Sequence, residues 1–473
     1  MAEKNCNTIY MMGIGGIAMG TLASMLREKG YRVAGSDQNL YPPMSTHLEA
    51  LAIPVCRGYS ADNLVRFAPD LVIVGNVIRR DNPEAQAVLR NGTPYLSMPQ
   101  ALARFFLGNH DSLVVTGTHG KSTTSSLLAW ILHHAGLDPS AFIGAFMKNW
   151  GASYHLGRGR CMVIEGDEYD TAFFDKGPKF LHYQPKVGLI TSVEYDHADI
   201  FRDFEAVVNA FAEFVKIIPD DGSLVVNGDD STCRALSRHC RGRVTTYGAS
   251  PDADWRLLEA EYTVGEVRFT CRNPLSGRVE RICSKLPGRH NLLNTLAARA
   301  VAAQAGLTPA QFQEGLLTFQ GVRRRQDLVG EAGGVLIMDD FAHHPTAVQE
   351  TLAALRRFYP ERRLLAAFEP RTNSSRRAVF QEAYAASFDA ADVVCIKQPP
   401  GLEAIPASER LDADRLVTDL KKQGKAARFF ETTEELVGFL DRHCRAGDLV
   451  VCMSNGSFDE LPHRLLQTLG VRS

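Results

Sequence analysis

Two glycine-rich loops constrain the fold of this chain more than any other feature of its 473 residues. The first is MMGIGGIAMG and the second is VVTGTHGKSTT, and each lies between an apolar run and a stretch of helical character. A strand, a glycine turn and a helix in that order begin a βα unit, whose strands pair in parallel. The loops therefore predict two separate α/β domains, in a chain too long for one ordinary core.

Strand–helix alternation continues along the chain and divides it into three regions, 1–108, 109–322 and 323–473. In each region short apolar runs alternate with helical stretches, which predicts a parallel sheet covered by helices. Between Asp252 and Lys285 the pattern changes to short alternating strands, so we expect an antiparallel insertion within the second region.

Composition and charge exclude several classes of partner. The net charge of -2 gives no general electrostatic reason to expect nucleic acid or an anionic membrane. No apolar run has the length that a bilayer requires, and the N-terminal residues lack the pattern of a signal peptide. The ten cysteines are scattered without metal-binding spacing, which is typical of reduced thiols in the cytosol. We therefore expect a cytoplasmic protein.

The first loop resembles a dinucleotide-binding turn. Gly13, Gly15 and Ala18 match the pattern G-x-G-x-x-G/A, and Asp37 ends the next apolar run. Such glycines let backbone N–H groups approach a pyrophosphate at a helix N-terminus, and Asp37 could accept a ribose hydroxyl. Taken alone, the loop is compatible with NAD(P), with another phosphate-bearing nucleotide, or with a purely structural turn.

The second loop has the elements of a phosphate-binding loop in a shorter form. Only two residues separate Gly117 from Gly120, whereas the usual P-loop has four residues between its glycines. Lys121 can still meet the β- and γ-phosphates, and the Ser122 hydroxyl can coordinate Mg²⁺. The alternative is a glycine-rich turn followed by a solvated lysine.

Acidic residues follow two apolar strands of the second region. EGDEYD contains Glu165, Asp167, Glu168 and Asp170, and VEYDHADIF contains Glu194, Asp196 and His197. Carboxylates at the carboxyl ends of parallel strands are natural Mg²⁺ ligands, whereas His197 is either a ligand or a hydrogen-bonded core residue. Two glycine loops imply two phosphorylated ligands and thus an ATP-driven reaction on a nucleotide-linked substrate. An NAD-dependent oxidoreductase or a non-catalytic nucleotide sensor would leave many of these residues unused.

Six segments in order along the chain resemble the Mur ligase family of bacterial cell-wall synthesis: TGTHGKSTT, EGDEYD, DHADIF, GRHNLLNTLAA, RRR and MDDFAHHPT. The phosphate loop of that family is the short form GT-x-GK-S/T-T. The resemblance implies a three-domain α/β architecture. An N-terminal Rossmann-like domain (1–108) would bind UDP-N-acetylmuramate, a central P-loop-type ATPase domain (109–322) would bind ATP, and a C-terminal Rossmann-like domain (323–473) would bind peptide.

Within the family, GIGGIAMG and GSD resemble the branch that binds UDP-N-acetylmuramate. YPPMSTHLEA, DTAFFDKGPKFLHY, EPRTNSS and MSNG are more similar to the ligase that attaches a recycled tripeptide, L-alanyl-γ-D-glutamyl-meso-diaminopimelate, than to the alternative, the muramate–alanine ligase. The resemblance implies a bacterial, cytoplasmic, ATP- and Mg²⁺-dependent ligase that forms a carbon–nitrogen bond through an acyl phosphate. It implies a monomer or a weak homodimer without specifying which.

The resemblance also implies residue roles. UDP-sugar binding falls to Gly13, Gly15, Gly16, Ser36 and Asp37, and ATP binding to Gly117, Thr118, His119, Gly120, Lys121, Ser122, Thr123, His290, Asn291, Asn294, Arg324, Asp339 and Asp340. Metal binding falls to Ser122, Glu165 and His197, catalysis to Lys121, Glu165 and His197, and peptide binding to Arg371, Arg376, Ser454 and Asn455. The asparagines could instead cap a helix, and Arg323–Arg325 could be a solvated hinge.

Two further expectations concern histidine and lysine. His343 and His344 are adjacent and should point apart, so we expect them to shape a loop and the helix start before Pro345 rather than to share a metal. Several members of the family carry a carbamylated lysine beyond the equivalent of His197. Phe211 and Ala212 occupy those positions here, with Lys216 displaced, so we expect no carbamylated lysine.

Overall fold

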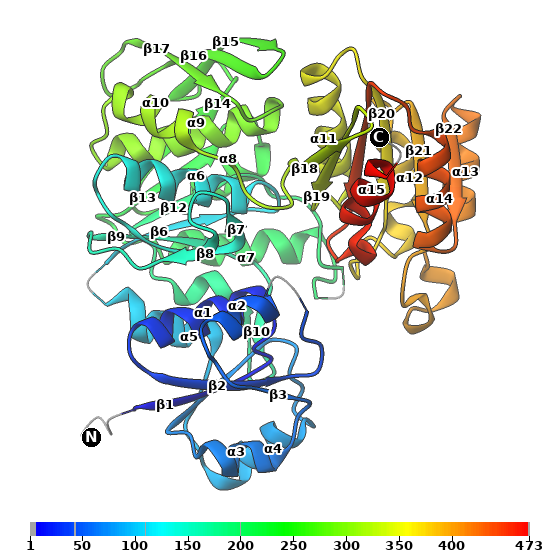
Figure 1. Ribbon diagram of the computed structural model, residues 1–473. Coiled ribbons are helices and arrows are strands. Elements are labelled where there is room, and N and C mark those ends of the chain that lie inside the picture. The colour runs from blue at the N-terminus through cyan, green and yellow to red at the C-terminus, as the bar shows by residue number, and fades with distance from the viewer. Residues whose placement is uncertain (1–5, 42–43, 109, 199, 472–473) are drawn as a thin grey trace. The chain divides into compact units, whose positions relative to one another are not determined.

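The computed structural model describes residues 6–41, 44–108, 110–198 and 200–471 (Figure 1). The chain forms two compact units. The first contains the residues up to Val193 together with Glu205–Thr246 and Ala297–Gly315, and the second contains Glu194–Phe204, Tyr247–Leu296 and Leu316–Ser473.

The N-terminal part of the first unit is a five-stranded sheet in the order β3-β2-β1-β4-β5, with every neighbouring pair parallel. Its strands are β1 (Thr8–Met12), β2 (Arg32–Asp37), β3 (Val55–Arg57), β4 (Leu71–Val74) and β5 (Tyr95–Ser97). Its helices are α1 (Ile17–Glu28), α2 (Met44–Ala50), α3 (Ala61–Phe67), α4 (Pro83–Asn91) and α5 (Met98–Leu102), with a π-helix at Ala103–Leu107. Strand order reverses at β1, so the loop after β1 lies at a topological switch point, where ligands bind in such sheets.

The central sheet of the first unit carries the second glycine loop. Its strands run in the order β14-β13-β12-β6-β9-β7-β8. They are β6 (Asp111–Thr116), β7 (Ser140–Met147), β8 (Ala152–His155), β9 (Cys161–Gly166), β12 (Val187–Ile190), β13 (Ser223–Asn227) and β14 (Arg243–Gly248). A small antiparallel ribbon is formed by β10 (Asp170–Ala172) and β11 (Asp175–Pro178). The helices are α6 (Lys121–His134), α7 (Phe204–Lys216) and α8 (Ser231–Ser237), together with α9 (Arg289–Gln304) and α10 (Pro309–Thr318), each of which contains residues of both units.

The second unit contains the antiparallel strands β15 (Trp255–Thr263), β16 (Glu266–Arg272) and β17 (Val279–Ser284), which confirms the expected antiparallel insertion. A six-stranded sheet follows in the order β18-β19-β23-β20-β21-β22. Its strands are β18 (Asp327–Ala332), β19 (Val335–Asp340), β20 (Arg363–Phe368), β21 (Val393–Lys397), β22 (Ala426–Phe430) and β23 (Asp448–Met453). Its helices are α11 (Pro345–Phe358), α12 (Gln381–Ser387), α13 (Ala413–Lys422), α14 (Thr433–His443) and α15 (Leu461–Gly470).

Both faces of this sheet are covered, because alternate residues of its strands belong to different hydrophobic clusters. In β20, Leu364 and Phe368 pack in a cluster with residues of α11, α12 and α13, whereas Leu365 and Ala367 pack in a cluster with residues of α14 and α15. Successive side chains of a strand point to opposite faces, so a strand that is buried on both faces reads as the continuous apolar run seen in the sequence.

The ends of one helix and one strand matter for the candidate site. Helix α6 begins at Lys121, so Lys121 and Ser122 lie in its first turn. Strand β12 ends at Ile190, so Glu194, Asp196 and His197 belong to an irregular segment beyond the strand rather than to its end. Pro42 and Pro43 of YPPMSTHLEA and Asp199 of DHADIF lie outside the described residues.

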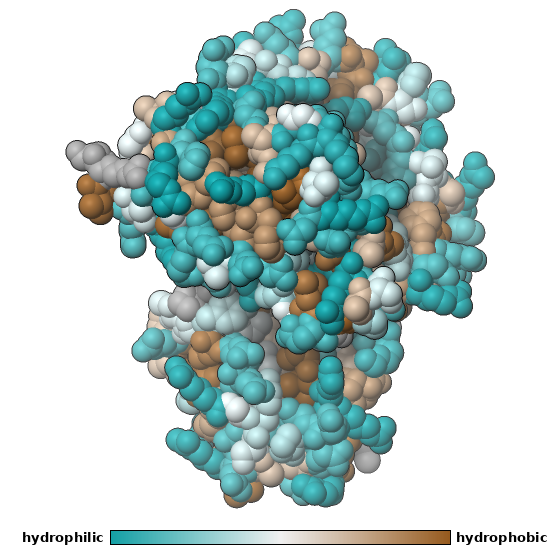
Figure 2. Space-filling model, turned by 90° about the vertical axis from the view of Figure 1, so that its right-hand side faces the viewer, coloured by the Kyte–Doolittle hydropathy of each residue, from teal (hydrophilic) through white to brown (hydrophobic). Residues whose placement is uncertain are grey.

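The surface is largely hydrophilic on the face shown in Figure 2, where hydrophobic residues form smaller groups. Within the described part of the chain, no helix has the length and apolar character needed to cross a membrane.

Candidate functional site

The first glycine loop is fixed by the end of β2. The N–H groups of Gly13 and Ile14 donate to the carbonyl oxygen of Ser36, at 2.8 and 3.1 Å. Asp37 accepts the Gly15 N–H through Oδ2 (2.8 Å) and the Asn39 N–H through Oδ1 (3.0 Å). The carboxylate of Asp37 is therefore already engaged in holding the loop, and its predicted contact with the sugar nucleotide stays a prediction, as do those of Gly16 and Ser36.

The second glycine loop lies at the centre of its sheet, because β6 pairs in parallel with β9 on one side and β12 on the other. The Gly117 backbone has φ of 131°, and a Cβ there would lie 2.1 Å from Thr191 Oγ1, so only glycine fits. The N–H of Thr118 donates to the Ser192 carbonyl (2.9 Å), and the N–H of His119 donates to Ser192 Oγ (3.1 Å). Residues that follow β12 thus fix the shape of the loop.

Lys121 lies inside this loop and is 12% exposed. Its Nζ donates to the Gly117 carbonyl (2.6 Å) and to Glu168 Oε2 (2.9 Å). Burial opposes the charged form of Lys121, but Glu168 and Asp167 outweigh burial and raise the pKa of the ammonium above its usual value. Lys121 therefore carries a positive charge within this loop, and its contact with the phosphates of ATP stays a prediction.

Ser122 and Glu165 come together as expected from the sequence. Ser122 Oγ donates to Glu165 Oε1 at 2.7 Å, and the Gly144 N–H donates to Glu165 Oε2 at 2.6 Å. Burial and the neighbouring Asp167 raise the pKa of the Glu165 carboxyl. In contrast, the pKa of Asp167 is lowered despite its burial, because Lys179 Nζ lies 2.9 Å from Oδ2. A hydroxyl and a carboxylate side by side are oxygen donors of the kind that Mg²⁺ prefers.

His197 belongs to the second unit, in the segment after β12. It has φ of 53°, and its N–H donates to Asp196 Oδ1 at 2.7 Å. Hydrogen bonding from His343, together with the charges of His343 and His197, lowers the pKa of Asp196 against the effect of burial. The metal-binding role of His197 stays a prediction.

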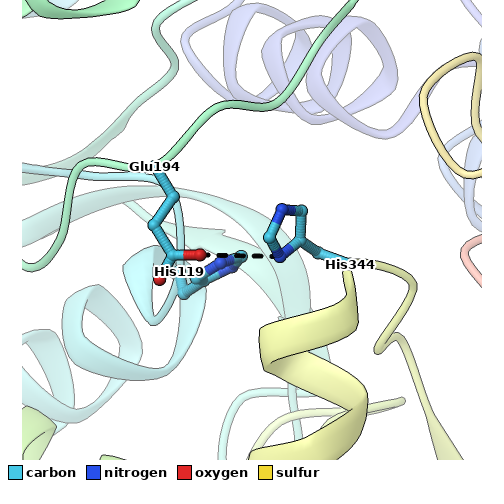
Figure 3. A group of neighbouring side chains, drawn as sticks. All are labelled: His119, Glu194 and His344. Atoms are coloured by element: carbon cyan, nitrogen blue, oxygen red, sulfur yellow. Dashed lines mark ion pairs between the residues drawn. The ribbon is translucent and has the colours of Figure 1, made fainter. Parts of the chain in front are cut away.

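His343 and His344 contact different carboxylates. His343 Nε2 lies 3.6 Å from Asp196 Oδ2, and His344 Nδ1 lies 3.7 Å from Glu194 Oε2, the ion pair drawn in Figure 3. The His344 side chain also accepts the Thr346 N–H and caps α11. The expectation that these histidines point apart and shape the helix start is confirmed.

Three predicted ATP-binding residues at the start of α9, namely His290, Asn291 and Asn294, lie in the second unit. Asn291 donates to the Pro287 carbonyl (2.9 Å) and to Gln326 Oε1 (3.0 Å), and it accepts from Asn294 (3.2 Å). Because α9 begins at Arg289, neither asparagine caps the helix, so that alternative is wrong. His290 Nδ1 lies 3.6 Å from Glu350 Oε2.

Arg324 is anchored rather than solvated, which argues against the hinge alternative at this residue. Its Nη2 donates to the carbonyl oxygens of Ser454 (2.6 Å) and Gly456, and its Nε lies 3.3 Å from Asp339 Oδ2. Burial raises the pKa of Asp339 to about 6, although Arg324 opposes the shift. Asp340 accepts the N–H groups of Gln326 (2.6 Å) and Ala342 (2.7 Å), so its carboxylate supports the backbone.

A buried carboxylate links the residues predicted to bind peptide. Glu369 is fully buried after β20 and accepts from Lys397 Nζ (3.0 Å), Ser454 Oγ (2.8 Å) and Arg371 Nη1 (3.4 Å). Arg371 keeps 38% of its side chain exposed. Arg376 instead donates to the carbonyl oxygens of Pro400 (2.8 Å) and Gly401 (2.9 Å) and so holds a neighbouring loop. Asn455 lies next to this network, and its Oδ1 is buried without a hydrogen bond in the described structure.

Several residues that shape these sites were not selected by any sequence motif. Ser192 and Thr191 contact the phosphate loop, Gln326 contacts Asn291, and Glu369 joins the predicted peptide residues. Glu168 was visible only as one of four acidic residues in EGDEYD. The position of Glu168 next to Lys121 depends on the pairing of β6 with β9, which no local motif reports.

Comparison with known families and proteins gives full-length matches. Residues 8–110 match the Mur ligase family catalytic domain, 115–302 the Mur ligase middle domain, and 324–456 the Mur ligase glutamate ligase domain. The chain is 37% identical to the UDP-N-acetylmuramate–L-alanyl-γ-D-glutamyl-meso-2,6-diaminoheptandioate ligase of Escherichia coli K12, with 98% of this chain and 99% of the relative covered. It is 34% identical to the UDP-N-acetylmuramate–L-alanine ligase of Carboxydothermus hydrogenoformans, with 97% and 96% covered.

A crystal structure of a murein peptide ligase from Psychrobacter arcticus superposes with a TM-score of 0.74 at 31% identity, with 98% of both chains covered. The fold is also that of the UDP-N-acetylmuramate–alanine ligase of Thermotoga maritima, at a TM-score of 0.82 and 23% identity over 98% of this chain and 100% of that one. With its three-domain α/β architecture, this chain belongs to the Mur ligase family.

Proposed function

We propose that this chain joins UDP-N-acetylmuramate to the tripeptide L-alanyl-γ-D-glutamyl-meso-diaminopimelate, at the expense of ATP, in peptidoglycan recycling. As a Mur ligase it is an ATP-dependent enzyme that forms a carbon–nitrogen bond. The observation that carries the choice of substrate is the 37% identity over 98% of the chain to the tripeptide ligase of Escherichia coli.

The three predicted regions have separate tasks in this proposal. Region 1–108 binds the sugar nucleotide at the loop after β1, region 109–322 binds the phosphates of ATP at the loop after β6, and region 323–473 binds the peptide. The carboxyl ends of parallel strands are where α/β sheets bind ligands, which supports the assignment of each loop.

The chemical problem is that a carboxylate does not accept an amine until one of its oxygens becomes a leaving group. The muramate carboxylate attacks the γ-phosphorus of ATP, which releases ADP and forms an acyl phosphate. The peptide amine then attacks the acyl carbon, phosphate leaves, and the ammonium proton is lost. Lys121 supports the first step, because its ammonium can neutralise negative charge on the oxygens of the β- and γ-phosphates.

Ser122 and Glu165 fit Mg²⁺, since both offer oxygen atoms 2.7 Å apart at the start of α6. Mg²⁺ held there would neutralise phosphate charge while the two anionic substrates approach each other. The protein's own contribution is to fix both oxygens, through the Gly144 N–H on Glu165 and the helix turn that carries Ser122. His197 remains the proposed additional ligand.

The alternative function, ligation of free L-alanine, is supported by the 34% identity over 97% of the chain to the alanine ligase of Carboxydothermus hydrogenoformans. In favour of the tripeptide, Arg371 offers a partly exposed guanidinium beside the buried Glu369, and this cation suits a carboxylate of a longer peptide.

Phosphate release should be measured with UDP-N-acetylmuramate, ATP and a panel of acceptors: L-alanine and the di-, tri- and tetrapeptide. We expect the highest kcat/KM with the tripeptide; a preference for alanine would establish the alternative.

A further inference from the structure

Two histidines and an aspartate, His133, Asp138 and His155, meet at the end of α6 that lies farthest from the phosphate loop. His133 is in the last turn of α6, Asp138 is in the turn before β7, and His155 ends β8. Because an α-helix rises about 1.5 Å per residue, His133 lies roughly 18 Å along α6 from Lys121. The group is therefore separate from the candidate ATP site.

The three side chains converge on one oxygen atom. Asp138 Oδ1 lies 2.9 Å from His155 Nε2 and 3.5 Å from His133 Nδ1. One ligand atom from each of the three residues lies within 4.8 Å of the others. Zn²⁺ bonds of about 2.0–2.2 Å at tetrahedral angles place neighbouring ligand atoms about 3.3 Å apart, so small shifts would admit an ion.

Contacts with neighbouring residues orient two of these side chains, those of Asp138 and His155. Asp138 Oδ2 accepts the Arg158 N–H (2.9 Å), and the Asp138 carbonyl accepts the Gly159 N–H (2.8 Å). The His155 ring stacks on Trp150, with ring centroids 4.7 Å apart and planes at 21°. Such supporting contacts are what orient ligands around a metal in proteins.

The third side chain has an unsatisfied donor–acceptor atom. His133 Nδ1 is buried and makes no hydrogen bond within the described structure, although it faces Asp138 Oδ1. The side chains of His133, Asp138 and His155 are 34%, 41% and 27% exposed, so the group lies near the protein surface.

We propose that His133 Nδ1, Asp138 Oδ1 and His155 Nε2 bind one divalent first-row transition metal ion, with Zn²⁺ as the best fit and water completing its coordination. Imidazole suits Zn²⁺, Ni²⁺ and Cu²⁺, whereas Mg²⁺ prefers oxygen ligands, so this site and the pair Ser122–Glu165 select different metals. The bound ion would tie the end of α6 to β8.

Zinc binding to the full chain should be measured by calorimetry in excess Mg²⁺, which keeps oxygen-rich sites occupied. We expect a one-to-one site that weakens at least about tenfold in His155→Gln and in Asp138→Asn. His134→Gln is the matched control, because His134 is the exposed neighbour of His133 on α6 and is not among the three ligands; it should bind zinc like the wild type. No zinc binding by the wild type, or equal affinity in His155→Gln, would overturn the proposal.

Tryptophan fluorescence gives a second readout. Two of the three tryptophans, Trp130 and Trp150, lie next to His133, with ring centroids 5.6 Å away in each case. Ni²⁺ should therefore quench the emission of the wild type and of His134→Gln, and should leave that of His155→Gln unchanged. Zinc should also raise the melting temperature of the wild type and not that of His155→Gln. If the melting temperature of His155→Gln without metal is below that of the wild type, Asp138→Asn serves as the test variant, because this change preserves the shape of the side chain.

Discussion

At the scale of single residues, Lys121 has the clearest role. Its ammonium is buried, positively charged and held between the Gly117 carbonyl and Glu168. A cation in this position is prepared to meet phosphate oxygens without a change of protonation state. Lys176, which is 69% exposed and pairs with Asp170, offers a matched control in the same unit.

We predict that Lys121→Ala lowers the rate of ATP-dependent ligation at least about a thousandfold, since a charge that stabilises the transition state is lost. Binding of UDP-N-acetylmuramate should be unchanged, because the first glycine loop is intact. Steady-state phosphate release and calorimetry with the sugar nucleotide measure the two effects. Lys176→Ala should behave like the wild type; wild-type turnover of Lys121→Ala would contradict the phosphate assignment.

Glu165 predicts a pH dependence of metal binding. Its pKa is raised by burial and by Asp167, so protons compete with Mg²⁺ for the carboxylate at a higher pH than for an ordinary glutamate. The Mg²⁺ concentration for half-maximal activity should therefore fall as the pH rises through the pKa of Glu165. In Glu165→Gln, the Mg²⁺ concentration for half-maximal activity should be higher at every pH and should no longer fall as the pH rises. An unchanged Mg²⁺ requirement in that variant would exclude Glu165 as a ligand; Asp170→Asn is the control.

At the scale of elements, the phosphate loop depends on a close approach between two segments. Gly117 and Gly136 both have positive φ, of 131° and 83°, but only Gly117 has close neighbours: a Cβ would meet Thr191 Oγ1 at 2.1 Å, whereas nothing lies within 4 Å at Gly136. Substitutions at these two glycines therefore distinguish the effect of a left-handed backbone, which both share, from the effect of contact with the loop after β12, which only Gly117 has.

Replacing each glycine by alanine tests this difference. Gly136→Ala should lower the free energy of unfolding by about 1 kcal/mol, the usual cost of a left-handed alanine, and should leave ATP affinity unchanged. Gly117→Ala should weaken ATP binding at least about tenfold, because Thr191 and the loop must move apart. Nucleotide titration and thermal denaturation measure the two quantities. Equal ATP affinity in both variants would show that this contact does not shape the site.

Some strands, helices and contacts of the fold were predictable from the sequence, and others were not. Apolar runs and glycine turns predicted β1, β6, α1 and α6 correctly, because period and turn chemistry are local properties. The pair Ser122–Glu165 was predictable because both residues follow parallel strands of one sheet. Ser192 beside His119 was not predictable, because that contact requires β12 to be the neighbour of β6. The end of β12 at Ile190 was not predictable either, since the run VGLITSVE has no turn signal after Ile190.

At the scale of the whole molecule, the predicted ATP-binding residues are divided between the two units. The phosphate loop with Lys121 belongs to the first unit, whereas Arg324, Asp339 and the asparagines of α9 belong to the second. The resemblance to the Mur ligases assigns both sets to ATP binding, so we expect ligand binding to change the arrangement of the units.

Small-angle scattering should detect this bias. We predict that an ATP analogue together with UDP-N-acetylmuramate reduces the radius of gyration, and that Lys121→Ala shows a smaller change under the same conditions. Coincident profiles with and without both ligands would indicate that the arrangement of the units does not depend on them.

The contact between Lys121 and the Gly117 carbonyl has a consequence for selectivity. Within the loop itself, a backbone oxygen already accepts a hydrogen bond from the Lys121 ammonium. An incoming anion must displace this internal competitor, and a lone inorganic phosphate offers fewer new bonds than a triphosphate with its metal. A ligand that brings several charged groups at once therefore competes for Lys121 better than a single small anion does.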